Sequence, residues 1–185
     1  MENIPIHKYI IIGDEGVGKT SVSLRYTDNM FSEKPSTIGV DFFSKTDRNV
    51  KIKIWDTAGS CRFKSIIKSF YRYTVGAIIV YDITSKNSFN SCSSWIQEVK
   101  ENTTDTCYIM LIGNKLDQED KREVSTEEAK KFAHKMGIPF FEVSAKDGTN
   151  VESSFYFFNS LHLSEKPELP SNLLIDIEHN KCYNC

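Results

Sequence analysis

Eight consecutive residues near the start of the chain have the types and spacing of a loop that binds phosphate. They read Gly13-Asp14-Glu15-Gly16-Val17-Gly18-Lys19-Thr20 and fit the pattern G-x-x-x-x-G-K-[ST]. Glycines let the backbone turn until its N–H groups face one point, and the start of a helix adds partial positive charge there. Lys19 is expected to reach the outer phosphates, and the Thr20 hydroxyl to bind Mg²⁺. The residues predicted to contact a nucleotide in this segment are Glu15, Gly16, Val17, Gly18, Lys19, Thr20 and Ser21.

Two later segments predict which base the site selects. Asn114-Lys115-Leu116-Asp117 follows the apolar run Tyr108–Ile112, so Asp117 would lie at the end of a strand. An aspartate there can accept hydrogen bonds from N1–H and the 2-amino group of guanine. Adenine has neither donor and would leave the carboxylate unpaired. Ser144-Ala145-Lys146, after the last predicted strand, would close over the base, so we expect GTP and GDP as ligands.

The segment Trp55-Asp56-Thr57-Ala58-Gly59 places a carboxylate and a glycine at another predicted strand end. Asp56 is well placed to hold the shell of a Mg²⁺ ion beside the phosphate loop. Gly59 has no side chain, so its backbone can approach a terminal phosphate closely. Thr37, in a loop that contains Pro35, is a further candidate ligand. The predicted metal residues are therefore Thr20, Thr37 and Asp56.

Apolar runs alternate with amphipathic stretches along the first 160 or so residues, which favours an α/β fold with a mostly parallel sheet. The predicted strands are Tyr9–Ile12, Val40–Thr46, Val50–Trp55, Val75–Tyr81, Tyr108–Ile112 and Phe140–Val143. The predicted helices are Lys19–Asp28, Ile66–Tyr73, Asn87–Lys100, Ser125–Met136 and Asn150–Leu163. A tight turn at Asp47-Arg48-Asn49 would make one antiparallel edge strand, in a six-stranded sheet covered by helices on both faces.

Composition excludes several other classes of protein. The net charge of −2 argues against nucleic-acid binding by phosphate neutralisation. No apolar run approaches the roughly 20 residues of a membrane span, and the first residues do not resemble a secretory signal. Five cysteines without an export signal are expected to be reduced thiols in the cytosol.

From residue 7 to about residue 163 the chain resembles the Ras superfamily of small GTPases, and the Rab branch within it. The motifs that carry the resemblance are GDEGVGKT, STIGVDF, KIKIWDTAG, RFKSI, YDIT, GNKLD and VSAK. It implies a single-domain fold over residues 1–163 that works as a GTP/GDP switch in vesicle trafficking. Such a protein would stay in the cytoplasm and cycle to the cytoplasmic face of intracellular membranes.

The resemblance also implies roles for particular residues. Thr37 and Gly59 would bind the γ-phosphate region, Thr20 and Thr37 would hold Mg²⁺ with Asp56 behind them, and Phe31 would pack against guanine. Residues 30–40 and 57–72 would be two switches that order on GTP binding and relax on hydrolysis. Effector proteins would read these switches, while an exchange factor and a GTPase-activating protein would drive the cycle.

Two residues depart from the family pattern at the phosphate end of the site. Ser60 stands where the family usually has the glutamine that orients the attacking water, and Glu15 stands where a small residue is usual. Serine is too short to reach that water, and a carboxylate there opposes the developing phosphate charge. The candidate catalytic residues are thus Lys19, Thr37, Gly59 and Ser60, with slow hydrolysis expected.

Two other functions remain open on the sequence alone. A GTP-binding module with negligible hydrolysis would act as a persistent effector-binding protein, which Ser60 and Glu15 favour. A nucleoside or ATP kinase would use the same phosphate loop, but Asn114-Lys115-Leu116-Asp117 argues against it.

Residues 164–185 are predicted to form a flexible tail, because Pro167 and Pro170 interrupt the helical pattern. The tail ends in Lys181-Cys182-Tyr183-Asn184-Cys185, where Rab proteins usually carry paired, prenylated cysteines. Four acidic residues against two lysines leave the tail without a basic membrane signal. Because one lipid anchors a protein only marginally, membrane residence would require both Cys182 and Cys185 to be modified. A soluble tail with two unmodified thiols is the alternative.

Overall fold

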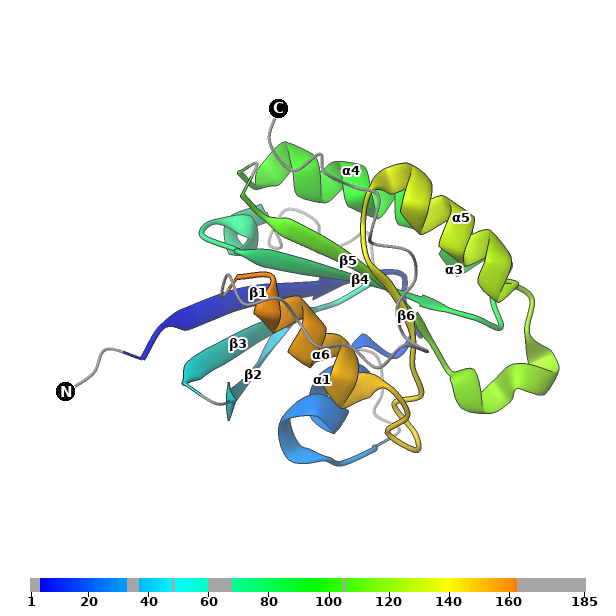
Figure 1. Ribbon diagram of the computed structural model, residues 1–185, viewed down its shortest axis with the longest axis horizontal. Helices are drawn as coiled ribbons and strands as arrows, with labels where there is room; N and C mark the ends of the chain where they lie inside the picture. Colours follow the sequence, from blue (N-terminus) through cyan, green and yellow to red (C-terminus); the bar gives the residue numbers. More distant parts are fainter. Residues whose placement is uncertain (1–3, 33–36, 48, 60–67, 105, 163–185) are drawn as a thin grey trace.

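The computed structural model describes residues 4–32, 37–47, 49–59, 68–104 and 106–162. It contains a six-stranded sheet with helices on both faces (Figure 1). The strands are β1 (Ile6–Ile12), β2 (Val40–Asp47), β3 (Val50–Thr57), β4 (Gly76–Asp82), β5 (Tyr108–Asn114) and β6 (Phe140–Glu142). The helices are α1 (Lys19–Asp28), α3 (Lys86–Asn90), α4 (Cys92–Asn102), α5 (Thr126–Met136) and α6 (Val151–Ser160), with 3-10 helices η2 (Lys68–Tyr71) and η3 (Leu116–Lys121).

The strand order is β2-β3-β1-β4-β5-β6, and only the β2–β3 pair is antiparallel. This confirms the predicted fold class. Parallel strands need crossover connections, and the helices supply them on both faces of the sheet. The carboxyl ends of β1, β3, β4, β5 and β6 therefore meet at one edge, where the loops with the predicted site residues follow them.

Successive side chains along a strand point to opposite faces of the sheet, and this divides the hydrophobic core into two layers. Tyr9 and Ile11 of β1 pack on the side of α1 and α6, while Ile10 and Ile12 pack on the side of α4 and α5. All four side chains are fully buried because both faces of this central strand are covered. Strand β3 differs: Ile52 and Ile54 are buried, whereas Lys51 on the opposite face is exposed. A continuous run of apolar residues thus marks the central strand β1, whereas an alternation of polar and apolar residues marks the half-covered strand β3.

The residues at the two ends of α5 explain where this helix begins and ends. At the start of α5, the Ser125 hydroxyl accepts a hydrogen bond from the Glu128 backbone N–H at 3.2 Å. The same helix ends at Gly137, whose φ of 68° lies in the left-handed region that glycine favours. The predicted helix over Ser125–Met136 is confirmed as α5, with Ser125 as its N-cap.

Other boundaries differ from the predictions. The single helix expected over Asn87–Lys100 is two helices, α3 and α4, which meet at Ser91. Serine hydroxyls compete with the helical backbone here, since Ser91 Oγ donates to the Asn87 carbonyl at 3.2 Å. The helix expected over Ile66–Tyr73 falls partly outside the described residues, and its described part is the 3-10 helix η2. Helix η3 begins within the Asn114–Asp117 motif, at Leu116, and was not predicted.

Two cysteines in the described part of the chain, Cys92 and Cys107, are free thiols. Burial raises the pKa of the Cys92 thiol to about 12 and of the Cys107 thiol to about 11. No helix among the described residues is long and apolar enough to span a bilayer. The predicted tail, residues 164–185, lies outside the described residues.

Gly76 is a site where close packing leaves no room for a side chain. A Cβ added there would lie 2.6 Å from the Phe158 ring and 2.8 Å from the Tyr9 ring. We therefore expect Gly76→Ala to lower the free energy of unfolding by about 1–3 kcal/mol, because buried rings must shift. Urea denaturation measures this, with Ser94→Ala on the exposed face of α4 as a control that changes it by less than about 0.5 kcal/mol. Equal stability of the two variants would contradict the packing argument.

Candidate functional site

The predicted phosphate loop connects β1 to α1, and Lys19 begins the helix. Lys19 is 5% exposed and its Nζ donates to the carbonyl oxygens of Gly13 at 3.0 Å and Asp14 at 2.7 Å. Burial lowers the pKa of Lys19 to about 8, although Asp56, Asp14 and Glu15 favour the charged form. The ammonium group is therefore held against the inside of the loop, where an anionic ligand would further favour its charge.

Gly59 lies against the phosphate loop itself. A Cβ at Gly59 would be 2.4 Å from both the Asp14 carbonyl carbon and the Glu15 nitrogen, closer than any real side chain approaches. The glycine was predicted to allow close approach to a terminal phosphate. In the structure it allows close approach of the segment after β3 to the loop that would hold that phosphate.

The three predicted metal residues come together from three different segments. Thr20 Oγ1 lies 2.8 Å from Thr37 Oγ1 and donates to Asp56 Oδ2 at 2.5 Å. Thr37 Oγ1 donates to the same carboxylate oxygen at 3.4 Å. The described residues hold no cluster of three or more His, Cys, Asp or Glu side chains that could bind a metal. Two hydroxyls and one carboxylate are oxygen donors, which suit Mg²⁺ rather than a softer metal.

The Asp56 carboxylate fits a cation in two further respects. Its Oδ1 is buried and lacks a hydrogen-bond partner within the described part of the chain. Burial raises the pKa of Asp56 to about 6, while the hydrogen bond from Thr20 and the charge of Lys19 favour ionisation. A cation beside this carboxylate would compensate both the unpaired oxygen and the cost of burial.

Asp117 lies at the other end of the candidate site. Its Oδ1 accepts a hydrogen bond from the Ser144 hydroxyl at 2.9 Å, and Lys146 Nζ lies 3.9 Å from its Oδ2. The structure therefore brings together the two segments that were predicted to contact the base. Lys115, in the first of these segments, has a φ of 70°, and its Nζ pairs with Asp82 Oδ2 at 2.5 Å.

Asn114 connects the two ends of the site through its side-chain amide. Nδ2 donates to the Val17 carbonyl at 2.9 Å, and Oδ1 accepts from the Ala145 backbone N–H at 3.1 Å. A Cβ at Gly18 would lie 2.3 Å from Asn114 Nδ2, so the glycine makes room for this amide. Asn114 was predicted to contact the nucleotide, and the structure places its amide between the phosphate loop and the Ser144–Lys146 segment.

Sequence reasoning missed three residues that hold these loops in place. Asp82 accepts from the Thr84 backbone N–H at 2.8 Å and pairs with Lys115. Arg25 donates to the carbonyls of Ala145 and Lys146 at 2.8 and 2.6 Å. Trp95 Nε1, on α4, donates to Asp14 Oδ1 at 2.8 Å. Spacing along the chain carries no signal for the contacts of Arg25 and Trp95 or for the Asp82–Lys115 pair, because these partners come from distant segments.

The remaining predicted site residues are less constrained. Gly16 and Glu15 are exposed on the phosphate loop, and Phe31 is 36% exposed, so its ring is accessible to a ligand. Ser60, Cys182 and Cys185 lie outside the described residues. The catalytic role of Ser60 and the lipidation of the two cysteines stay predictions.

Comparison with known proteins identifies the family. Residues 8–162 match the Ras family. The GTP-binding protein ypt1 of Schizosaccharomyces pombe and the Ras-related protein RABD2a of Arabidopsis thaliana are each 46% identical over 155 residues, 81% of this chain and 76% of each relative. The Ras-related protein Rab-11B of Dictyostelium discoideum is 45% identical over 163 residues, 85% of this chain and 74% of the relative. The chain therefore belongs to the Ras family of small GTPases, and to the Rab type within it.

Proposed function

We propose that this protein is a switch in membrane trafficking that binds GTP and GDP with Mg²⁺ and hydrolyses GTP slowly. The observation that carries the proposal is the convergence of Thr20, Thr37 and Asp56 beside the phosphate loop. A relative that matches over most of this chain is itself named a GTP-binding protein. The predicted phosphate residues follow β1 and the predicted base residues follow β5 and β6, and Asn114 hydrogen-bonds to both groups of loops.

At the phosphate end, the backbone N–H groups of the loop and the Lys19 ammonium would bind the outer phosphates. When bound, Mg²⁺ would neutralise charge that develops on these phosphates. Thr20, Thr37 and Asp56 would hold it, since their oxygen atoms already lie within hydrogen-bond distance of one another. Thr37 thereby joins the segment after residue 36 to the nucleotide site.

At the base end, Asp117 would accept two hydrogen bonds from guanine. The Ser144 hydroxyl donates to Oδ1 and so fixes the orientation of the carboxylate. Adenine would leave this acidic group unpaired, which costs more than the loss of an ordinary contact. Lys115 would lie over the base region with its ammonium group held by Asp82.

Two exposed apolar residues near Thr37 form the surface that effectors would read. Ile38 is 87% exposed and Phe42 is 52% exposed, and the Phe42 ring contacts Trp55 edge-on at 5.0 Å. The Ala58 backbone N–H donates to the Gly39 carbonyl at 2.9 Å, so the described parts of the two predicted switches touch. Loss of the γ-phosphate would release Thr37 and Gly59, and this apolar surface would change with them.

Slow hydrolysis follows from Ser60 and Glu15. Catalysis of phosphoryl transfer rests on positioning and on electrostatics, and serine cannot position the water that a glutamine side chain would reach. Glu15 adds negative charge on the loop at the point where Gly59 packs. The second candidate, a GTP-binding module without turnover, is favoured by the same two residues. It differs from the proposed switch only in the rate of GTP hydrolysis.

Association with membranes would come from lipids on Cys182 and Cys185. Both are required because a single chain gives only marginal binding. The protein would then exchange between the cytoplasm and the cytoplasmic face of an intracellular membrane.

Replacing Asp117 by Asn tests the base site. The amide presents an N–H₂ donor where guanine also presents donors, so we expect GDP affinity to fall about 100-fold or more. Xanthosine diphosphate, which has a carbonyl at position 2, should bind the variant better than GDP. Competition against a fluorescent nucleotide measures both, with Asp120→Asn on the exposed side of η3 as the control. Equal binding of ATP and GTP to the natural protein would contradict the proposed function.

Replacing Asp56 by Asn tests the metal site. We expect the Mg²⁺ concentration that half-suppresses GDP release to rise about tenfold or more, because the variant lacks the carboxylate that the two hydroxyls surround. The matched control is Asp41→Asn, which stands opposite Asp56 in the β2–β3 register but is exposed. Superimposable Mg²⁺ titrations of the Asp56→Asn variant and the natural protein would remove Asp56 from the metal site.

Replacing Ser60 by Gln tests the origin of slow hydrolysis. In single-turnover experiments with bound GTP, we expect the variant to release phosphate about tenfold faster or more than the natural protein. Ser65→Gln, in the same segment, controls for the added side chain. If Ser60→Gln and the natural protein hydrolyse at one rate, the serine does not limit the reaction.

A further inference from the structure

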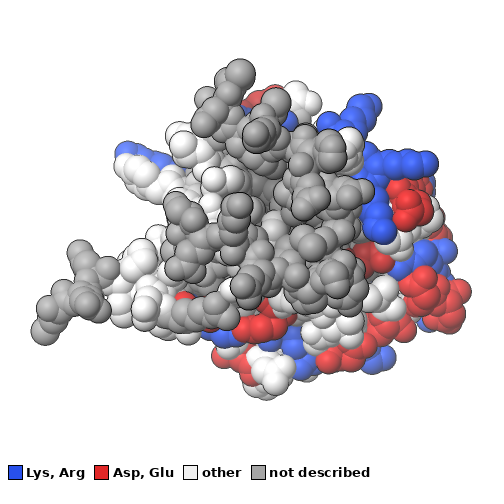
Figure 2. Space-filling model, viewed as in Figure 1, with Lys and Arg blue, Asp and Glu red and all other residues white. Residues whose placement is uncertain are grey.

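Three neighbouring segments of this acidic protein carry mainly basic side chains. In the described residues of β1, β3 and the segment 68–75, the acidic side chain is Asp56 alone, which is buried in the metal site. The same segments carry the basic residues Lys8, Lys51, Lys53, Lys68 and Arg72. The chain as a whole has a net charge of −2, and over α5 basic and acidic side chains lie side by side (Figure 2).

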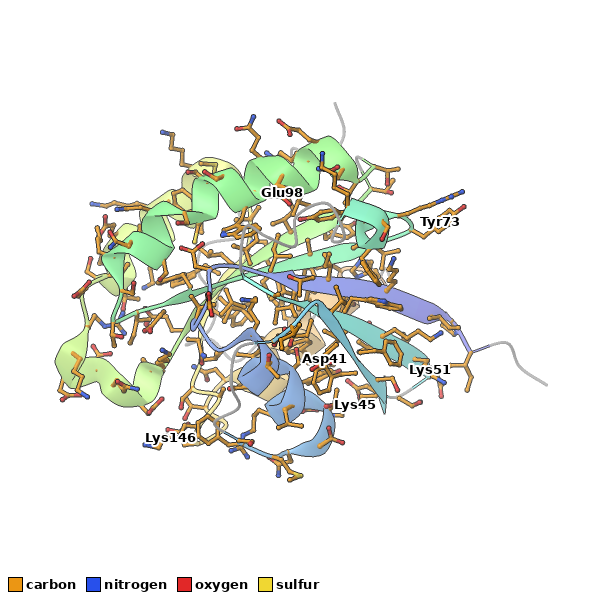
Figure 3. All side chains as sticks on the ribbon, turned by 180° about the vertical axis from the view of Figure 1, so that it is seen from behind. Asp41, Lys45, Lys51, Tyr73, Glu98 and Lys146 are labelled. Carbon is orange, nitrogen blue, oxygen red and sulfur yellow. The ribbon has the colours of Figure 1, made fainter. Side chains whose placement is uncertain are left out.

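Strand register gathers these cations on one face of the sheet. Lys8 stands opposite Lys53, and Ile6 opposite Lys51, in the parallel β1–β3 pair. Lys8 Nζ donates to the Arg72 carbonyl at 2.6 Å, which joins the segment before β4 to the same row. Tyr73 and Lys51 lie at the end of the molecule where β1 begins (Figure 3). We call this set the basic end surface: Lys8, Lys51, Lys53 and Arg72, with Ile4, Ile6 and Tyr73.

Exposed apolar side chains accompany the charges. Ile4 and Ile6 are each 53% exposed, and Tyr73 is 76% exposed. Tyr73 has a φ of 60°, a left-handed conformation that is costly for a bulky residue. The Arg72 guanidinium lies 4.7 Å from the Tyr73 ring centre and donates to its Oη at 2.7 Å. Strained backbone thus presents an aromatic ring and a cation together to solvent.

The last described residue, His162, lies at this same end of the sheet. His162 Nε2 lies 2.9 Å from the carbonyl oxygen of Val75, two residues after Tyr73. The His162 ring packs edge-on against Tyr108 at 4.8 Å. The described part of the chain therefore ends beside the basic end surface, and Cys182 and Cys185 belong to the 23 residues that follow in the sequence. Residues 163–185 carry net negative charge, so a basic signal for membrane binding must come from another part of the chain.

We propose that the basic end surface binds the anionic phospholipid surface of a bilayer and so supplies the second membrane signal that the tail lacks. Cations near such a surface each strengthen binding by about fivefold, and aromatic side chains favour the headgroup region. This proposal rests on the proposed cycling between cytoplasm and membrane. Thr37 and Asp117 lie at the opposite ends of the strands, so the nucleotide site would face away from the bilayer.

The test uses the full chain without lipid modification, loaded with GDP and Mg²⁺, and sedimentation with vesicles. We expect binding to phosphatidylcholine vesicles that contain about 30% phosphatidylserine, weak binding to pure phosphatidylcholine, and loss of binding at about 0.5 M salt. The triple variant Lys51→Gln, Lys53→Gln, Arg72→Gln should bind at least about tenfold more weakly. The matched triple Lys121→Gln, Lys131→Gln, Lys135→Gln removes equal charge from η3 and α5, outside the basic end surface, and should change binding less than about twofold.

Tyr73→Gly separates binding from folding. Glycine adopts a φ of 60° without strain, so this variant should be at least as stable as the natural protein and yet bind vesicles about threefold more weakly. Equal affinity for the two vesicle types, or equal losses from the two triple variants, would overturn the proposal. So would binding of a polyglutamate peptide without any binding of vesicles, because the surface would then recognise acidic protein segments. GDP affinity, measured on the same samples, distinguishes failure of this proposal from failure of the proposed function.

Discussion

The side-chain amide of Asn114 is the contact on which the arrangement of the site depends. It donates to Val17 in the phosphate loop and accepts from Ala145 after β6, so one residue on β5 connects three loops. A parallel sheet brings the loops to one edge but does not fix their distances from one another. The N–H₂ and C=O groups of this amide are both buried. Leaving either one without its partner would cost more free energy than the hydrogen bond itself contributes. The separation between the phosphate end and the base end therefore depends on this amide.

A second set of contacts connects this rigid part to the segments that would move. Thr20 belongs to α1, whereas Thr37 and Gly59 belong to the two predicted switches. Their contacts are a hydroxyl pair and a close backbone packing, neither of which has a large apolar area behind it. Such contacts change easily with the charge between them, while the apolar layers on both sides of β1 stay closed. The fold thus combines a stable sheet with weakly attached segments at its functional edge.

The sequence allowed the fold and much of the candidate site to be predicted, and for identifiable reasons. Buried runs such as Ile10–Ile12 and the period-two run Lys51–Ile54 mark strands, and Gly13–Thr20 marks the phosphate loop, because these signals are local. The break at Ser91 was missed because hydroxyl competition with the helical backbone leaves no periodic signal. Arg25, Asp82 and Trp95 were missed because their partners lie far away in the chain and no spacing rule joins them. Local chemistry is readable from sequence, whereas support across the fold requires coordinates.

The hydrogen bond from Trp95 to Asp14 has a practical consequence. The chain contains two tryptophans, and this one donates its indole N–H to a carboxylate of the phosphate loop. The other, Trp55, lies beside Lys8 and Phe42 on the sheet face near the effector surface. Indole emission responds to polarity and to hydrogen bonding, so each ring is an intrinsic fluorophore at a different working part of the molecule. Nucleotide exchange and partner binding can thus be followed optically on the unlabelled protein.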